Sequence, residues 1–564
     1  MLSVKLNGSF VEIADDFSMT MNLKSPIFNE TGSSSYPFKI PITPRNSLIM
    51  NFWHRIESTV DVYKDIPCEI FWHESMIFIG IFKCRVSVDS YEGSLYEGNG
   101  HFNYFQKTIS LQQVDFGKIS FDNPVDLLAW INDGKDAVYP ERSICFPSLY
   151  NEYYYDPPAT IDELMRFNYY DSTGTMFFSL GFTIENRILI VPMLYFKFFF
   201  FKIFEYLKYK LDDQFFTPNS DFDKLVIFNN VSANEWDGGA DPQPIPGDNF
   251  FKYFIGNLVN YDGPWEFLLN YHVPRMSLND FITGLETFFN IRFFVNNITR
   301  TIRVLSVDSI LKANLNVDFN ENVISVTTEL DEQLRGFHFK TNVDQSDNHL
   351  QAKYVIEQSL MDNLQKPVDS LADLPIWPGT LLDEIRYVIQ EKSYYYINKY
   401  TKIWQKYPSI TDIALNTQFI IKEIDKVISS NFSTNSTDTG DFVSIGVKRE
   451  EWAGIPFHLF FTKRINVQDP DVNGLYAVSR TDDISLLVNG EQGLYNKNYK
   501  EYFNFLLSSR AVNILKMFMH HELAEIDFAR KYQINGINYL FSTIQVTLKK
   551  TSISTAKIKA YTCK

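Results

Sequence analysis

The sequence predicts an α+β chain of several domains, with a β-rich N-terminal domain, repeated helix-plus-hairpin modules and an α+β C-terminal domain. Its 564 residues are enough for about three or four domains of ordinary size. Apolar and polar residues alternate in the N-terminal part, and one helix-plus-hairpin pattern occurs at residues 192–229 and again at 274–307. Such a unit cannot bury its own apolar face, so it packs against neighbours. This favours a modular structural protein over an enzyme with a single pocket.

The two modules follow the same order of elements. Each begins with a proline, Pro192 or Pro274, and continues with an apolar stretch of helical spacing. An extended segment, a polar turn and a second extended segment follow. We therefore predict a helix laid on a β-hairpin in each module. Whether they are true repeats stays open, because helix and hairpin periodicity alone produces the same likeness.

The N-terminal domain contains a predicted hairpin at residues 67–88, with His73, Glu74 and Ser75 as its turn. Before it lies a proline-rich segment, residues 31–46, in which three prolines impose extended backbone and Asn46 can start a helix. Two interpretations of this segment are open. It is either an arm that docks on a neighbouring subunit or a long connection between strands of one domain.

The rest of the chain divides by changes in pattern. A short helix is expected at 124–131, and a helix at 499–519 precedes strands joined by the turn dipeptide Asn535-Gly536. The predicted divisions are a β-rich domain at 1–115, an irregular connecting region at 116–190, the two modules at 191–311, strands with an inserted β meander (354–429) at 312–445, and an α+β domain at 446–564.

Composition narrows the class of partner. The net charge of −16, without any run of Lys or Arg, disfavours nucleic acid and anionic membrane surfaces as binding partners. The 50 Phe and 32 Tyr suit broad sheets and subunit contacts, although a compositional bias of the source genome explains them equally well. Cys68, Cys84, Cys145 and Cys563 lie far apart, which predicts reduced thiols rather than a zinc site or a disulfide framework.

The sequence predicts neither a signal peptide nor a membrane span. The first residues, MLSVKLNGSF, hold no apolar core of a signal peptide, so we expect folding in the cytoplasm. Residues 188–207 are apolar over about twenty positions, but Lys197, Lys202 and Glu205 interrupt them. We expect a core helix there, with Lys197 and Lys202 on its exposed side.

Few residues suggest chemistry, and we predict no catalytic, cofactor-binding or metal-binding residue. The sequence contains no nucleophile elbow, phosphate-binding loop, dinucleotide fingerprint or HExxH motif. We expect His520-His521-Glu522 at a helix C-terminus, where the dipole favours histidine, rather than on a metal. The acid pairs Asp15-Asp16 and Asp212-Asp213 fall in expected turns, where carboxylates are usually solvated. We therefore expect a protein that is not an enzyme.

Three segments carry a resemblance to a known family: Ser34 to Asn46 (SSYPFKIPITPRN), Leu494 to Tyr502 (LYNKNYKEY) and Ile526 to Leu540 (IDFARKYQINGINYL). Together with the modules, they resemble large tail proteins of phages and prophages of Bacteroidetes hosts. The resemblance implies a virion structural protein of the tail tip or baseplate, similar in role to hub proteins that close a tail tube as a ring. It implies a homo-oligomer, a trimer or higher ring, in contact with other tail and baseplate proteins, and brings no catalytic residue or cofactor.

The expected function is thus a tail tip or baseplate hub that oligomerises around the tail channel and supports host attachment or DNA delivery. Its expected location is the virion tail, after synthesis and assembly in the host cytoplasm. Two rivals remain. A carbohydrate-active enzyme or glycan-binding protein would use the abundant Tyr and Trp in a cleft with two carboxylates. An envelope ring or channel component would also use helix-hairpin modules, but the missing signal peptide argues against it.

Overall fold

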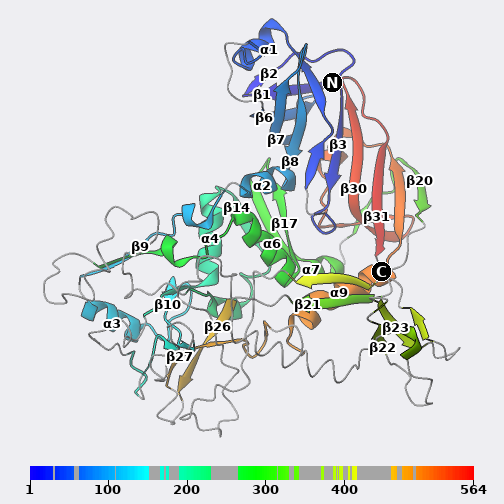
Figure 1. Ribbon diagram of the computed structural model, residues 1–564. Helices are drawn as coiled ribbons and strands as arrows, with labels where there is room; N and C mark the ends of the chain where they lie inside the picture. The colour runs from blue at the N-terminus through cyan, green and yellow to red at the C-terminus, as the bar shows by residue number, and fades with distance from the viewer. Residues whose placement is uncertain are drawn as a thin grey trace.

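The structure is a computed structural model with mixed helices and strands, and it confirms the α+β class (Figure 1). It describes residues 1–29, 32–55, 63–107, 109–122, 124–150, 166–170, 173–176, 190–229, 265–313, 316–329, 336–341, 370–373, 385–388, 390, 393–397, 404–406, 410–415, 459–466, 473–486 and 491–563.

The largest element is a curled 14-stranded sheet built from both ends of the chain (Figure 1). Its main path runs β2-β1-β6-β7-β8-β4-β3-β30-β31-β28-β20. The strands are β1 (Leu2–Leu6), β2 (Ser9–Phe10), β3 (Ser18–Lys24), β4 (Ser33–Ser35), β5 (Phe38–Pro41), β6 (Lys64–Trp72), β7 (Ser75–Val86), β8 (Ser90–Glu97), β19 (Asn316–Asp318), β20 (Val323–Thr328), β28 (Ala511–Lys516), β29 (Lys531–Ile534), β30 (Ile537–Lys549) and β31 (Ala556–Cys563).

The two ends of the chain meet where β3 pairs with β30. The antiparallel register runs from Ser18 opposite Lys549 to Lys24 opposite Thr543. The sequence analysis assigned these ends to separate domains, whereas the strands share one sheet and one apolar core. The domain boundaries themselves stay a prediction.

Two turns of this sheet were predicted from the sequence and are confirmed. The hairpin β6–β7 pairs Trp72 with Ser75 around His73, whose φ is 45°. The hairpin β29–β30 turns at Asn535 and Gly536, which have φ angles of 52° and 78°. Asn and Gly tolerate this left-handed backbone better than other residues, which is why the dipeptide marks the turn.

The proline-rich segment lies inside the sheet of its own chain. Strand β4 pairs with β3 and β8, and β5 pairs with β8. Within this chain the segment therefore connects strands, as the second interpretation expects. Helix α1 (Pro44–Ile49) follows, and its N-cap is Thr43.

Asn46 does not start helix α1, contrary to the prediction. The residue is fully buried within the helix, and its side chain fastens the helix to the segment after β2. Its Oδ1 accepts a hydrogen bond from the Glu12 backbone N–H at 2.8 Å, and its Nδ2 donates to the carbonyl oxygens of Glu12 and Pro41 at 2.8 and 2.9 Å. Asn46 is therefore a buried clamp between two loops.

The second module folds as predicted. Helix α6 (Leu278–Phe289) begins after the N-cap Ser277 and ends at Asn290, which is left-handed with φ of 51°. Strands β17 (Ile291–Asn296) and β18 (Thr301–Ser306) then form an antiparallel hairpin. The predicted helix on a hairpin is confirmed for this module.

The first module has the predicted helix, α4 (Phe196–Tyr206), but its two strands do not form a hairpin. Strand β14 (Lys210–Asp213) pairs in parallel with β18 of the second module. Strand β15 (Leu225–Ile227) pairs with β26 (Leu459–Asn466). The chain turns away after β14 because Asp213 accepts backbone hydrogen bonds from Phe215 and Phe216, each at 3.0 Å. The two modules thus share one sheet, β14-β18-β17.

Phenylalanines fill the core around these modules. Four phenylalanines of α4 are buried, and the rings of Phe200 and Phe216 lie 5.1 Å apart, edge to face. Phe199 and Phe281 join α4 to α6 in the same manner, 5.2 Å apart. Edge-to-face rings add to the free energy of burial. Much of the aromatic content therefore serves the interior of the fold.

Helix α4 is the core helix predicted at residues 188–207, and within the described residues no helix is long and apolar enough to cross a membrane. The prediction that Lys197 faces solvent is wrong. Its side chain is 4% exposed, and its Nζ lies 2.6 Å from Asp223 Oδ1. The Nζ also donates to the Asn219 carbonyl oxygen at 3.0 Å. Lys202, in contrast, pairs near the surface with Glu205.

The C-terminal helix predicted at 499–519 is half as long as expected. Helix α9 (Lys500–Ser508) follows a π-turn, η9 (Tyr495–Tyr499), and the chain then enters strand β28. The alternating burial of β28 against β31 shows that pairing overrides helical propensity there. The short helix predicted at 124–131 is confirmed as α3 (Pro124–Asp133).

The remaining elements are short. The predicted meander is present as β22 (Ile385–Val388), β23 (Ser393–Ile397) and β24 (Trp404–Lys406). Of the connecting region predicted at 116–190, residues 123, 151–165, 171–172 and 177–189 lie outside the described residues. The others are α2 (Asn99–Gln106), β9 (Lys118–Phe121) with β16 (Trp265–Leu268), β10 (Ile144–Cys145) with β13 (Met193–Leu194), β11 (Leu149–Tyr150) with β12 (Arg166–Phe167), α7 (Val307–Lys312), β21 (Gly336–Thr341) with β25 (Ile410–Leu415), β27 (Asn473–Val478) beside β26, α10 (His520–Ala524), and the 3₁₀ turns η2 (Leu111–Gln113), η5 (Ser220–Lys224), η6 (Leu269–His272) and η7 (Leu371–Asp373).

Asn46→Ala should destabilise the curled sheet. It removes the fully buried amide and leaves the Glu12 N–H and two carbonyl oxygens without their partner, which costs about 2–4 kcal/mol. Denaturant unfolding followed by circular dichroism measures this. The control is Arg45→Ala, one residue earlier on the exposed side of α1, which should change the free energy of unfolding by about 0.5 kcal/mol or less. Equal effects of the two variants would contradict the clamp.

The two lysines of α4 should behave differently. Lys197→Ala leaves Asp223 without its buried partner and should cost about 2–4 kcal/mol, less than a fully buried pair because Asp223 retains contact with water. Lys202→Ala removes a surface pair and should change stability by about 0.5 kcal/mol or less. Thermal melts of both variants make the comparison, and a Lys202 effect as large as that of Lys197 would refute it.

Candidate functional site

His520, His521 and Glu522 lie at the start of a short helix, not at a helix C-terminus as predicted. They open α10, and Glu522 Oε2 accepts a hydrogen bond from the Met519 backbone N–H at 2.7 Å. Glu522 Oε1 also lies 3.0 Å from Nζ of Lys516, a fully buried lysine. The carboxylate of this motif therefore caps a helix and pairs with a buried cation.

The acid pairs also have structural partners. Asp15 pairs with Lys550 at 2.6 Å, and the pKa of Asp15 is lowered by this hydrogen bond and by the charge of Lys550. Asp213 Oδ2 accepts from the Thr217 backbone N–H at 2.8 Å and so completes the turn after β14. Among the described residues, no group of three or more His, Cys, Asp or Glu is placed to hold a metal ion.

The four cysteines are buried and free in the structure. Burial raises the pKa of the Cys68 and Cys145 thiols above the ordinary value, and that of Cys84 to about 12. A thiol reacts through its thiolate, so these residues are held in the unreactive form at neutral pH.

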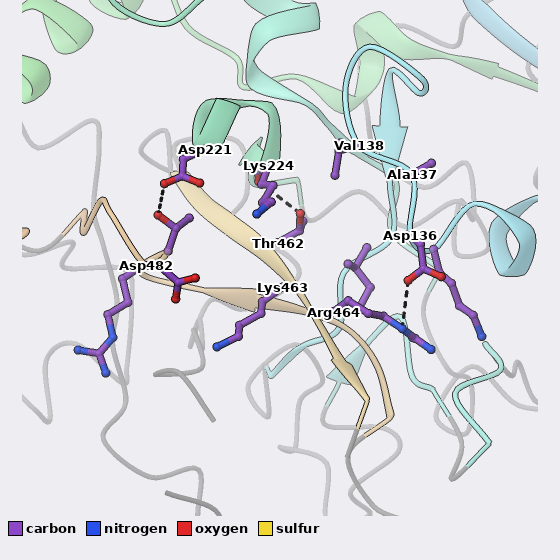
Figure 2. A pocket seen from close by; sticks show the side chains of 13 residues that line it. Asp136, Ala137, Val138, Asp221, Lys224, Thr462, Lys463, Arg464 and Asp482 are labelled. Carbon is purple, nitrogen blue, oxygen red and sulfur yellow. Dashed lines mark hydrogen bonds and ion pairs between the residues drawn. The ribbon is translucent and has the colours of Figure 1, made fainter. Parts of the chain in front are cut away.

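The clearest candidate site is a polar pocket of about 480 Å³ at the β26–β27 hairpin (Figure 2). One wall is the loop after α3, at residues 135–138, and another is the turn η5. Residues 480–482, directly after β27, complete it. The pocket is lined by Lys135, Asp136, Ala137, Val138, Asp221, Lys224, Thr462, Lys463, Arg464, Leu475, Arg480, Thr481 and Asp482.

Cations outnumber carboxylates in this pocket. Five lining residues are Lys or Arg and three are Asp, although the whole chain carries a net charge of −16. Figure 2 shows Asp136 and Arg464 at one side of the pocket and Asp221 and Asp482 at the other. The local field therefore favours an anionic group, against the average of the surface.

Two of the three carboxylates already have partners. Asp136 Oδ1 lies 3.3 Å from Arg464 Nε. Asp221 Oδ2 accepts a hydrogen bond from the Thr481 hydroxyl at 2.8 Å. The Thr481 hydroxyl oxygen in turn accepts a hydrogen bond from the Ile484 backbone N–H at 3.1 Å. These contacts tie the walls together and leave the excess of positive charge in place.

The lining supports binding better than nucleophilic chemistry. The lining residues that the structure describes include no His, Cys or Ser, and the Thr481 hydroxyl serves the turn at 481–484. A nucleophile needs a base that is itself oriented by a third group, and the lining residues do not form that arrangement. The pocket can hold a carboxylate or a polar chain segment through ionic contacts and hydrogen bonds.

Sequence reasoning did not find this pocket. Its lining comes from four segments between residues 135 and 482, and no spacing in the chain relates them. The one local signal is the pair Lys463-Arg464 in a strand that begins with three apolar residues. A basic pair of this kind occurs on many exposed strands, so it does not identify a site by itself.

Comparison with known proteins identifies no family for this chain. No protein-family model matches the sequence, and no curated protein matches it. Two solved structures are similar to it at low scores. The 43 kDa tail protein of prophage MuSo2 from Shewanella oneidensis is 6% identical, with a TM-score of 0.31 over 99% of this chain and 95% of that one. The tail protein from Neisseria meningitidis MC58 is 7% identical, with the same TM-score and coverage. At these scores neither likeness assigns a fold or a role to the chain.

Proposed function

We propose that this protein is a structural component of a phage tail, and more specifically a tail tip or baseplate hub protein that oligomerises around the tail channel. The observation that carries the proposal is the placement of the three sequence segments that resemble tail proteins of Bacteroidetes phages. They are hundreds of residues apart in the chain, yet they lie in one unit of the fold.

Two of the segments are neighbours in the curled sheet. Residues 34–46 contribute to β4, contain β5 and open α1, and residues 526–540 contain β29 and open β30. Strand β3 pairs with β4 on one edge and with β30 on the other, so it joins both segments. A pattern shared across a family is expected where distant parts of a chain must fit together.

The third segment packs on the same unit. Residues 494–502 form η9 and begin α9. Tyr502 and Phe505 belong to a small apolar cluster that also contains Leu540 and Tyr561, from β30 and β31. All three segments therefore support one structural unit, as expected of a module that serves assembly.

The proposed mechanism is mechanical. The protein would act as a trimer or higher ring in contact with other tail and baseplate proteins, located in the virion tail after assembly in the host cytoplasm. Its acidic surface would repel the phosphates of passing DNA, because like charges across an aqueous channel keep the polymer away from the wall. Host attachment or DNA delivery would then follow from position in the tail, without a chemical step.

The glycan-binding alternative has no supporting observation in the described pocket. Such sites combine two carboxylates with aromatic rings on which sugars stack. The described lining of the pocket at β26–β27 has carboxylates but no aromatic residue. An envelope ring component would also be an oligomer. Its location in the cell envelope, rather than in the virion, would distinguish it from a tail protein.

Size-exclusion chromatography with light scattering tests the proposal. We expect a particle whose mass is a whole multiple, three or more, of the 65.8 kDa chain. Negative-stain images should show rings, and mass spectrometry of purified virions should detect the chain. A stable monomer at every concentration would overturn the ring, while absence from virions would overturn the assignment to the tail.

A further inference from the structure

A second cavity lies where the curled sheet meets the β17–β18 hairpin. It encloses about 730 Å³, and its walls come from β3, β8, the β17–β18 hairpin, β19 and α10. In Figure 1 the hairpin and α2 lie directly below the end of β8. The cavity is therefore a gap at the joint between the two largest parts of the fold.

Side-chain amides fix the walls of this cavity. Asn99 Nδ2 donates to the Phe293 carbonyl oxygen at 2.5 Å, and Asn99 Oδ1 accepts from the Val295 backbone N–H at 3.2 Å. Asn297 Nδ2 donates to the Ile79 carbonyl oxygen at 3.3 Å. These bonds join β17 and its turn to the sheet, so the cavity is formed before any partner arrives.

Glu97 extends into this cavity from an apolar face. Tyr91 and Leu95 on the same strand are fully buried in the core of the curled sheet. Glu97 follows Leu95 by two residues and so lies on the same face of β8. No described residue is its hydrogen-bond or ion-pair partner, and although Glu97 keeps partial contact with solvent, desolvation in the cavity raises its pKa to about 7.

Two of the cations that line the cavity pair with another carboxylate. Arg303 Nη2 lies 2.5 Å from Asp527 Oδ1, and Arg530 Nε lies 3.2 Å from Asp527 Oδ2. The lining holds five carboxylates against three Lys or Arg side chains and His521. The cavity therefore carries more acidic than basic side chains, and a positive group that enters it can pair with the Glu97 carboxylate.

We propose that the joint cavity receives a basic side chain, Lys or Arg, from a partner protein, with the Glu97 carboxylate as its anchor. The apolar lining, which includes Phe78, Phe294 and Phe319, suits the aliphatic stem of such a side chain. The charged head then reaches Glu97 at the end of the core face. A cation there pairs with a partly buried carboxylate that has no cation beside it among the described residues.

This inference does not rest on the proposed tail function. It requires only that the chain binds another protein, and it stands or falls on Glu97 alone. A monomeric chain absent from virions would overturn the tail proposal and leave this one intact.

The test uses the full chain and an acetylated, amidated tetralysine peptide as the probe, measured by isothermal titration calorimetry at pH 7. We expect the peptide to bind, and Glu97→Gln to weaken its affinity by about tenfold or more. The matched control is Glu74→Gln, in the exposed turn of β6–β7 on the same sheet. It makes the same change of charge and should bind as the unaltered chain does.

Proton release is a second readout. A general electrostatic attraction between the peptide and an acidic protein would not produce it. Pairing with a cation lowers the pKa of Glu97, so binding at pH 7 should release about half a proton per peptide. Titrations in two buffers of different ionisation enthalpy measure this number. Glu97→Gln should abolish the release and Glu74→Gln should preserve it. Absence of binding, equal affinity of Glu97→Gln, or binding without proton release each overturns the proposal.

The pH dependence of stability checks the state of Glu97 without any peptide. Its pKa is raised on folding, so the folded chain holds this proton more tightly than the unfolded chain does. The stability linked to Glu97 is therefore complete below its unfolded pKa and falls as pH rises through about 7. Glu97→Gln should melt at a higher temperature than the unaltered chain at pH 8, with a smaller difference at pH 5. Identical melting curves at both pH values would remove the basis of the anchor.

Discussion

The pairing of β3 with β30 is the constraint on which the rest of the structure depends, because it brings the two ends of the chain into one sheet. Its register is set by burial. Met21 lies opposite Val546, and Leu23 lies opposite Ile544, with all four side chains in the core. On the other face the Thr20 and Thr547 hydroxyls are hydrogen-bonded at 2.7 Å. A slip of one residue would exchange these faces and bury the polar side chains.

Because β3 and β30 are paired, the part of the chain between them begins and ends at the same sheet. The modules, the small sheets and the meander lie between two segments that are already neighbours, so each must fold back towards the sheet. The β17–β18 hairpin achieves this through Asn99 and Asn297, and it also accepts β14 on its other edge. One hairpin thus links the core of the curled sheet to the phenylalanine core around α4 and α6.

The sequence predicted features whose cause is local. The turns at His73 and at Asn535-Gly536 follow from a few adjacent residues, and so do the helix and hairpin of the second module. The partners of β14 and β15 were not predictable in this way. Each has the composition of a strand, but its pairing is decided by segments far along the chain, β18 and β26. The same applies to the end of α9, because β31 draws the following residues into the sheet, and to the pocket at β26–β27, whose four segments meet only in the fold.

Lys197 and Glu97 are both charged residues on apolar faces, but they differ in whether the chain supplies a partner for the charge. Lys197 interrupts the buried face of α4, and the sequence predicted it on the solvent side. Glu97 lies at the end of the core-facing row of β8. The fold supplies Lys197 with Asp223 and carbonyl oxygens, so its charge is compensated within the chain. Lys516 is compensated likewise by Glu522 and by the ring of Phe319, whose centroid lies 4.2 Å from its Nζ. Glu97 has no such partner in the described residues, although Arg303 and Arg530 line the same cavity and pair with Asp527 instead. Lys197 and Lys516 are therefore compensated within the chain, whereas the partly exposed Glu97 carboxylate stays open to a cation from the proposed partner protein.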